Sequence, residues 1–281
     1  MNTDYVQRFL FEDLDVRGRL ACLTHAWSSM TEGRGYPEQI AGLLGRATAL
    51  TVLLGANQKG TRRTTLQVRG EGPVSLLVVD CTPELCIRGM AQYAPAAAAP
   101  VPLERALLGD GRLALTLEDE GSGQVYQSLV PLEGDSLSDI FAHYLAQSEQ
   151  LPSFLLLHAD ARAACGLLLE KLPGADAKDA DGWNRVTRLA ATLALGETVG
   201  AQPYHLLTKL FPEELLRVFR LDAVEYRCPY DPENVRRMLK SLGRAELDAI
   251  LDERGEIVVK NEMCNHEYRF DRAAVAAMFD A

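Results

Sequence analysis

Apolar and polar residues alternate in short runs through most of the first 175 positions, which is the pattern of half-buried strands. Turns rich in Gly, Pro and Asp separate these runs, so consecutive strands are expected to pair in an antiparallel meander. The predicted strands are residues 9–11, 16–23, 64–69, 74–80, 86–91, 113–117, 125–130 and 154–158. We expect an α+β core domain over residues 1–175, with an antiparallel sheet and packed helices.

Two longer segments have helical periodicity instead. Apolar residues recur at i, i+3, i+4 and i+7 through residues 38–54, which predicts a core-facing helix whose glycines let another element pack closely. Residues 136–150 carry a second apolar stripe, and Asp135 is placed to cap that helix. Residues 165–172 are expected to complete the core domain as a helix or a turn.

Residues 176–224 are predicted to form a helical linker. The pieces 183–195, 204–211 and 212–219 have helical spacing, and glycines and a proline separate them. Their apolar content is higher than a solvent-exposed connector should carry. Two interpretations follow, a helical subdomain packed permanently on the sheet or an apolar face that binds other proteins. The residues assigned to this face are Leu206, Leu207, Leu210, Phe211, Leu215, Leu216 and Phe219.

Residues 225–281 have the layout of a small α+β module with a β-hairpin knuckle. Cys228 lies just before Asp231, a favourable N-cap, and a helix follows until Gly243. A second short helix, a strand and a turn containing Cys264 lead into the last strand. Zinc closes a structural site with four Cys or His ligands, but the two halves of this module supply only two cysteines.

Composition restricts the class of protein. The chain has 281 residues, of which 47% are hydrophobic and 24% charged, as in ordinary globular proteins. Its net charge of −10 disfavours nucleic-acid binding, which depends on Lys and Arg neutralising phosphates. The sequence shows neither a secretory signal nor a run of about 20 apolar residues, so we expect a cytoplasmic protein without membrane partners.

The six cysteines are spread along the chain, so a disulfide scaffold is not expected. Cys22 and Cys165 lie in apolar runs and are predicted to be buried packing residues. Cys81 and Cys86 flank the turn in DCTPELC and could approach each other, but the preferred interpretation is that they are incidental residues at strand ends. The sequence contains no GxSxG, HExxH or phosphate-binding glycine loop, so we expect a protein that is not an enzyme.

Several of these segments resemble the 33 kDa heat-shock chaperone family, heat shock protein 33. The resemblance lies in DYVQRFLFEDLDVRG, QVRGEGPVSLLVVDCTPE, YQSLVPLEGDSLSDIFAHYLAQSEQLPS, EYRCPYDPENVRRML and EIVVKNEMCNHEYRF, and so covers almost the entire chain. The family pattern has four cysteines in a CxC and a CxxC motif. Cys228 and Cys264 match one cysteine of each motif, whereas Tyr230 and Asn261 stand at the other two positions.

The resemblance implies an ATP-independent holdase that binds unfolding client proteins and is a homodimer when active. It implies a resting state kept inactive by a zinc-bound switch. Oxidation of this switch to disulfides releases zinc, unfolds switch and linker, and exposes apolar surface.

With Tyr230 and Asn261 replacing two ligands, we expect no tightly bound zinc; any zinc would use Cys228 and Cys264. Packing and a hydrogen bond would then hold the module, and activity would be constitutive or heat-triggered. Cys228 and Cys264 remain as the redox pair, able to form a disulfide if their Cα atoms lie within about 7 Å.

A thiol enzyme is the alternative from another functional class. Cys264 would be its nucleophile and His266 its base, since residues i and i+2 of a strand share a face. The sequence shows no third catalytic group for them. A lowered pKa of the Cys264 thiol would favour this alternative.

Overall fold

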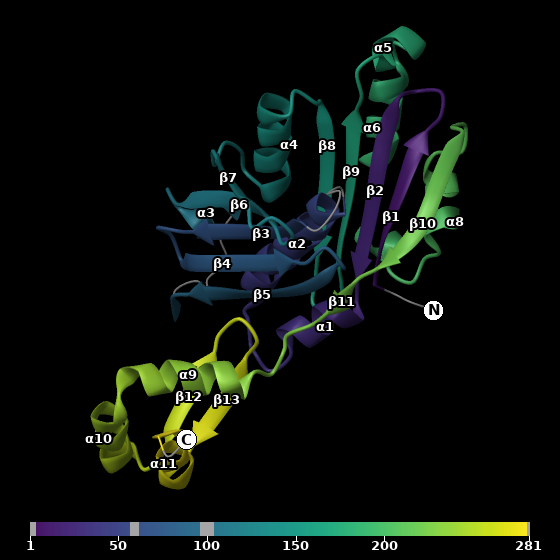
Figure 1. Cartoon of the computed structure of the whole chain (residues 1–281). Helices are drawn as coiled ribbons and strands as arrows, with labels where there is room; N and C mark the ends of the chain where they lie inside the picture. The colour runs from purple at the N-terminus through teal and green to yellow at the C-terminus, as the bar shows by residue number, and fades with distance from the viewer. Residues whose placement is uncertain (1–3, 57–61, 96–103, 280–281) are drawn as a thin grey trace. The chain divides into compact units, whose positions relative to one another are not determined.

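The computed structural model describes residues 4–56, 62–95 and 104–279. The stretch 93–102 is rich in alanine and proline and has no periodicity, which predicts a surface connection, and it lies mostly outside these ranges. The chain divides into two compact units, Met1–Arg227 and Cys228–Ala281. Both contain helices and antiparallel strands, which confirms the α+β fold class (Figure 1). Within the described part of the chain, no helix is long and apolar enough to cross a membrane.

Sheet A of the larger unit has five strands and is antiparallel throughout. In order across the sheet, the strands are β10 (Leu216–Ala223), β1 (Tyr5–Phe11), β2 (Val16–Leu23), β9 (Ala164–Lys171) and β8 (Ser153–Ala159). The prediction of a helix or turn at residues 165–172 is wrong, because β9 pairs residue by residue with both β2 and β8. Its buried positions are continuous, as expected for a central strand covered on both faces.

The edge strand β10 is a second correction. Residues 212–219 are predicted to be helical, but Leu216–Ala223 pairs with β1 instead. The apolar positions of the run LLRVF fit a helical stripe as well as an alternating strand, so periodicity alone does not distinguish the two. Hydrogen bonding to β1 stabilises the extended form.

Sheet B of the larger unit has six strands. In order, they are β11 (Glu225–Tyr226), β5 (Cys86–Tyr93), β4 (Val74–Cys81), β3 (Arg62–Arg69), β6 (Arg112–Asp119) and β7 (Val125–Val130). The predicted meander is confirmed by the pairs β4–β5, β3–β4 and β6–β7. The short strand β11 adds to β5 in parallel, so the residues that precede the C-terminal unit are anchored on this sheet.

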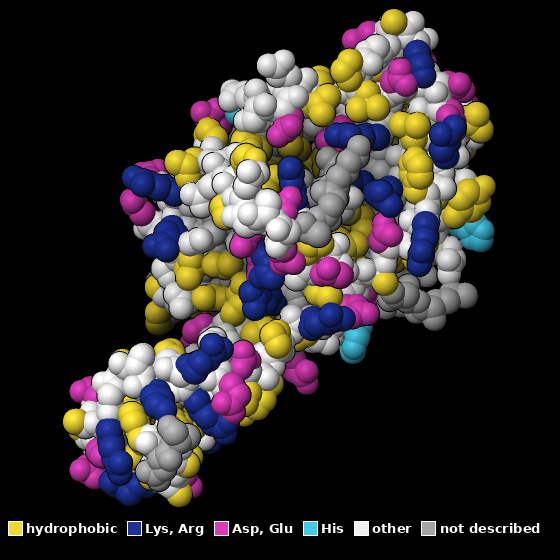
Figure 2. Space-filling view, viewed as in Figure 1, with side chains coloured by type: hydrophobic (Ala, Val, Ile, Leu, Met, Phe, Trp, Pro, Cys, Tyr) yellow, Lys and Arg dark blue, Asp and Glu magenta, His cyan; other side chains and the backbone are white. Residues whose placement is uncertain are grey.

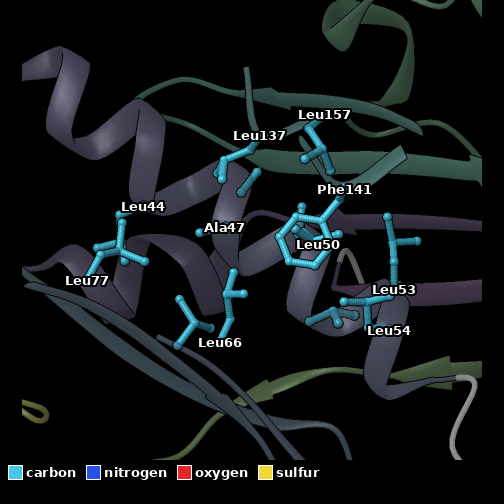
Figure 3. Close-up of a cluster of buried hydrophobic side chains, with 14 of the residues drawn as sticks. Leu44, Ala47, Leu50, Leu53, Leu54, Leu66, Leu77, Leu137, Phe141 and Leu157 are labelled. Carbon is cyan, nitrogen blue, oxygen red and sulfur yellow. The ribbon is translucent and has the colours of Figure 1, made fainter. Parts of the chain in front are cut away.

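The helix α2 (Glu38–Gly55) packs against strands of both sheets. Its Leu44 and Leu50 are fully buried in a cluster shared with residues of both sheets (Figure 3). A Cβ atom at Gly45 would lie 2.5 Å from the Cβ of Ala159 on β8, so glycine is needed for this close approach. The predicted close packing at this helix is therefore confirmed at Gly45.

The helix α4 (Leu137–Ser148) covers part of the same core through Ile140 and Phe141. Its N-cap is Ser136 rather than the predicted Asp135. The Ser136 hydroxyl accepts a hydrogen bond from the Asp139 backbone N–H at 3.2 Å, and the Asp139 carboxylate accepts one from the Ser136 backbone N–H at 3.2 Å. The short helices α1 (His25–Thr31) and α3 (Glu104–Leu108) also belong to this unit.

Short helices cover the face of sheet A that points away from α2. They are α5 (Ala175–Lys178), α6 (Gly182–Ala190), α7 (Leu195–Thr198) and α8 (Pro203–Leu210). A second apolar cluster joins α6, α8 and the residues that follow them to β1, β2 and β9. Its members from this segment are Val186, Ala190, Leu193, Leu206, Leu207 and Phe211. In this structure the helical part of the predicted linker packs on sheet A, whereas Leu216–Ala223 belongs to that sheet as the edge strand β10. That it acts as a separate domain stays a prediction.

The smaller unit consists of α9 (Pro232–Leu242), α10 (Arg244–Arg254), the hairpin β12 (Ile257–Asn261) and β13 (His266–Phe270), and α11 (Arg272–Phe279). The predicted N-cap is present, since the Asp231 side chain accepts a hydrogen bond from the Asn234 backbone N–H at 2.9 Å. Its small core contains Leu239, Leu247, Leu251, Ile257, Tyr268, Phe270, Val275 and Met278. The smaller unit therefore has a hydrophobic core of its own.

Candidate functional site

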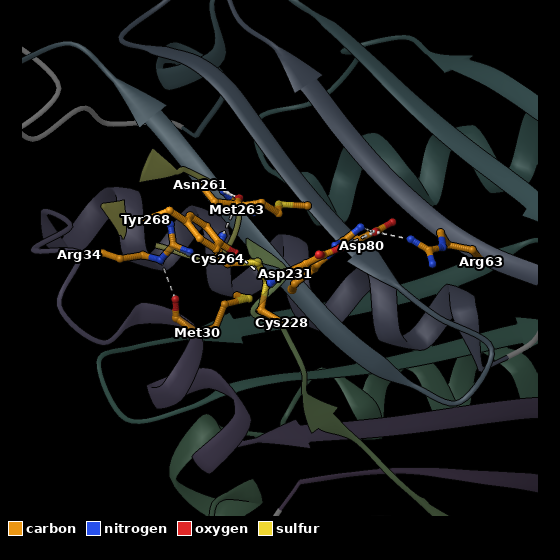
Figure 4. Close-up of a disulfide and its surroundings, with 11 residues drawn as sticks. Met30, Arg34, Arg63, Asp80, Cys228, Asp231, Asn261, Met263, Cys264 and Tyr268 are labelled. Atoms are coloured by element: carbon orange, nitrogen blue, oxygen red, sulfur yellow. Dashed lines mark hydrogen bonds and ion pairs between the residues drawn. A yellow bond between two sulfur atoms is a disulfide. The ribbon is translucent and has the colours of Figure 1, made fainter. Parts of the chain in front are cut away.

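A disulfide joins Cys228 to Cys264 in the smaller unit (Figure 4). Cys228 precedes the capped N-terminus of α9, and Cys264 lies in the turn between β12 and β13. Their Cα atoms are 5.6 Å apart, inside the range of about 4.4–6.8 Å that disulfides require. The bond therefore ties the first helix of the module to its hairpin.

Asn261 organises the turn that carries Cys264. Its side-chain oxygen accepts hydrogen bonds from the backbone N–H groups of Met263 at 3.1 Å and Cys264 at 3.3 Å (Figure 4). Its backbone carbonyl also accepts from the Cys264 N–H at 3.2 Å. An Asn side chain that satisfies the next backbone donors stabilises a tight turn without a metal.

Tyr230 occupies its position by aromatic packing. Its ring stacks on Tyr268, with centroids 4.7 Å apart and 10° between the ring planes, and meets His266 edge-on at 5.7 Å. The Tyr268 hydroxyl accepts a hydrogen bond from the Asp231 backbone N–H at 3.1 Å. The sequence reasoning missed Tyr268, although its inward position in the alternating strand HEYRF was the available signal.

These residues do not fit a structural zinc ion. Zinc needs four ligands with free lone pairs, yet Cys228 and Cys264 are bonded to each other, and a tyrosine and an asparagine stand at the other two positions. Among the residues that the structure describes, no group of three or more His, Cys, Asp or Glu side chains could hold a metal ion.

The thiol-enzyme arrangement is not formed in this structure. The sulfur of Cys264 is bonded to Cys228 and is not a free nucleophile. His266 begins β13, packs edge-on against Tyr230, and its buried Nδ1 atom has no hydrogen-bond partner. A catalytic base needs contact with its nucleophile and a group that orients it, and neither is shown here.

The residues assigned to a binding face do not form one face. Leu206, Leu207 and Phe211 are buried against sheet A. Leu215 and Phe219 point to solvent, with 64% and 45% of their surface exposed. The remaining two, Leu210 and Leu216, are partly buried at the edge of the same cluster.

Comparisons with known proteins identify the family over nearly the whole chain. The family model described as "Hsp33 protein" matches residues 4–271. The chain is 40% identical to the 33 kDa chaperonin of Azotobacter vinelandii, over 98% of this chain and 94% of that protein, and 36% identical to the 33 kDa chaperonin of Pseudomonas fluorescens, over 99% and 94%. The crystal structure of the 33 kDa chaperonin from Thermotoga maritima matches with a TM-score of 0.80 and 21% identity, over 99% of this chain and 98% of that chain, which supports the fold. The chain therefore belongs to the Hsp33 protein family.

Proposed function

We propose that this protein is an ATP-independent chaperone, a holdase of the stress response that binds unfolding proteins and limits their aggregation. Membership of the Hsp33 family and relatives named 33 kDa chaperonin support this function. The observation that carries it is the set of short helices that cover an apolar face of sheet A.

The covering helices are individually weak. α6 has nine residues and α8 has eight, and isolated helices shorter than about 12–15 residues are marginal in water. Their stability therefore comes from packing, for example the edge-to-face contact of Phe211 with Phe11 at a centroid distance of 4.9 Å. When these helices lift from sheet A, the aromatic and leucine side chains that were buried on the helices and on the sheet become exposed. These side chains then form a surface for unfolded clients.

Oxidation should affect the stability of this C-terminal module in the opposite direction from that of a zinc switch. A disulfide between Cys228 and Cys264 spans 36 residues, and closing such a loop stabilises a fold by about 3–4 kcal/mol. Oxidation of this pair thus tightens the module, whereas the resemblance implies that oxidation opens it. We therefore propose that chaperone activity is either constitutive or triggered by heat, and that it is not triggered by peroxide. This activity requires no zinc.

The partners follow from the same proposal. Clients are unfolded proteins, and the active form is a homodimer in the cytoplasm. Acidic and basic side chains are interspersed over the visible surface of the described residues before Cys228, without the single-sign field that nucleic acids select (Figure 2). Sedimentation of the purified protein tests the dimer.

An aggregation assay tests the function. A client that unfolds on warming is followed by light scattering with the oxidised protein, the dithiothreitol-reduced protein and no addition. We expect protection by the preheated protein in both redox states, and no gain on adding peroxide. Activity that appears only after peroxide, or stoichiometric zinc in the purified protein, would overturn the proposal.

Site-specific crosslinking tests the surface. A photoreactive residue placed at Leu210, at the partly buried edge of α8, should crosslink to client after heating. The matched control places the same residue at Met238, which is exposed on α9. Equal client crosslinking from both positions would contradict the assignment of the apolar face to α8.

A further inference from the structure

Four side chains with titratable groups form a row across sheet A. The strand register pairs Tyr5 on β1 with Cys22 on β2, Cys22 with Cys165 on β9, and Cys165 with His158 on β8. Residues directly opposite each other on antiparallel strands project to the same face. This row therefore lies on one face, and its cysteines belong to the cluster that α6 and α8 cover (Figure 1).

The two cysteines are placed for a bond. The Sγ atoms of Cys22 and Cys165 are 2.7 Å apart, and a disulfide needs about 2.05 Å. Opposed residues of antiparallel strands have Cα atoms about 4.5–5.5 Å apart, which is within the range of disulfides. The two sulfur atoms therefore need to approach each other by less than about 1 Å to form the bond.

Burial protects the pair in this conformation. Cys22 and Cys165 are 1% and 2% exposed and belong to the same apolar cluster as Leu207 of α8. The hydrogen bond with Cys22 and burial both raise the pKa of Cys165, and burial raises the pKa of Tyr5, whose hydroxyl is buried without a hydrogen-bond partner. A thiol held in its protonated form is a poor nucleophile towards oxidants.

We propose that Cys22 and Cys165 form a second thiol redox site, which a peroxide oxidises to a cross-strand disulfide when the helices α6–α8 lift from sheet A. The dependence on lifting rests on the proposed function; the bond itself rests on the strand register. One thiol attacks the peroxide, whose O–O bond breaks, and gives a sulfenic acid and water. The other thiol attacks the sulfenic sulfur, forming the S–S bond and a second water. Two thiol hydrogens and two electrons pass to the peroxide.

Cys81 and Cys86 provide a built-in control. Both are also buried and free, but the register places Cys81 opposite Ile87 and Cys86 opposite Glu225, so neither faces another thiol directly. Simple burial of a cysteine therefore does not create the geometry of the proposed site.

Peptide mapping of the wild-type full-length protein tests the bond. The reduced protein is treated with hydrogen peroxide at increasing temperature, alkylated under denaturing conditions, digested without reduction and analysed by mass spectrometry, while hydrogen exchange follows α8. We expect a Cys22–Cys165 linked peptide, two hydrogens lighter than its reduced parts, that accumulates as α8 begins to exchange. Recovery of Cys22 and Cys165 as alkylated thiols to the same extent as Cys81 and Cys86, once α8 has exchanged, would overturn the proposal.

A pair of variants tests the role of the covering helices. Leu207→Ala removes a fully buried side chain of α8, and Tyr204→Ala removes an exposed one from the same helix. We expect Leu207→Ala to form the linked peptide about tenfold faster, because local opening becomes more frequent, and Tyr204→Ala to match the wild type. Equal rates in both variants would contradict gating by the helices. A linked peptide in a protein that fails the aggregation assay would leave the redox site standing and overturn the chaperone function alone.

Discussion

The ring of Tyr230 lies nearly parallel to the ring of Tyr268, with 10° between their planes, at a position where the resemblance described above places a cysteine. Tyr268 is buried in the core of the module, and its hydroxyl holds the backbone N–H of Asp231 at the start of α9. The stack thus connects the helix to the hairpin, which is the connection that four thiolates and zinc would otherwise make. Aromatic packing is weaker than metal coordination. The module should therefore unfold at a lower temperature than a module of the same fold held by zinc.

Removing the stack should destabilise the module. We expect Tyr230→Ala to lower its free energy of unfolding by about 1 kcal/mol, the usual value of an aromatic pair beyond its buried area. The measurement is thermal unfolding followed by tyrosine signals in near-ultraviolet circular dichroism. Met238→Ala, at an exposed position of α9, is the control and should change the midpoint little. Equal midpoints for the two variants would count against a stabilising role for Tyr230.

Reducing the disulfide should weaken the module further. We expect dithiothreitol to lower its stability by about 3–4 kcal/mol, because the reduced unfolded chain regains the entropy of a 36-residue loop. Hydrogen exchange of α9 and β12 measures this change. Cys228→Ser should already show the reduced behaviour and no longer respond to dithiothreitol. A wild-type module that exchanges identically in both redox states would contradict the prediction.

Restoring two cysteines should restore a zinc site. In Tyr230→Cys/Asn261→Cys, four thiols occupy the positions of the family's CxC and CxxC motifs, and four thiolates complete a tetrahedral site. We expect about one zinc per chain in the reduced double variant, measured by elemental analysis, and far less in Tyr230→Cys alone. A double variant without zinc would show that the surrounding backbone has also diverged.

The carboxylate of Glu170 should make the core sensitive to acid. It lies between Arg17, whose Nε donates to it at 2.8 Å, and the buried Arg19, which also donates to it. Burial acts to raise the pKa of Glu170, but the charge of Arg19 and the hydrogen bonds outweigh it and hold the pKa below its usual range. Its stabilising contribution is therefore complete above the usual glutamate pKa of about 4.3 and is lost as the pH falls through the lower folded-state pKa.

Glu170→Gln measures this contribution. It leaves the buried Arg19 without its counter-charge and should cost about 3–5 kcal/mol at pH 7, measured by urea unfolding. The difference from wild type should shrink at pH values below the folded-state pKa of Glu170. Glu225→Gln, which breaks an exposed pair with Arg227, is the control and should cost about 0–1 kcal/mol. A difference that is constant with pH would contradict this account.

Local sequence signals predicted most of the strands and the long helix, because these elements have a clear period and defined turns. α2 and the β3–β4–β5 meander were predicted from spacing alone. Strand β10 was not, since its apolar spacing fits both periods and the deciding contact is with β1, about 200 positions earlier in the chain. The opposition of Cys22 and Cys165 is likewise a property of register, which no local pattern in the sequence reveals.

The candidate site was predicted in part. The resemblance located Cys228, Tyr230, Asn261 and Cys264, and in the structure Tyr230 stacks on Tyr268 while Asn261 accepts hydrogen bonds. That these contacts take the place of a metal stays a prediction. The partner of Tyr230 was not identified, although the alternation in HEYRF already places Tyr268 on the inward face of its strand. That this face meets Tyr230 depends on the packing of the hairpin β12–β13, which no local pattern specifies. Whether α8 binds clients stays a prediction.

Hydrogen exchange of residues 176–281 as a function of temperature tests the central claim most directly. The account predicts that the amides of α6 and α8 exchange at a lower temperature than those of α2, and that client protection appears over the same interval without peroxide. Exchange of α8 only together with α2, in global unfolding and without any client protection, would contradict it.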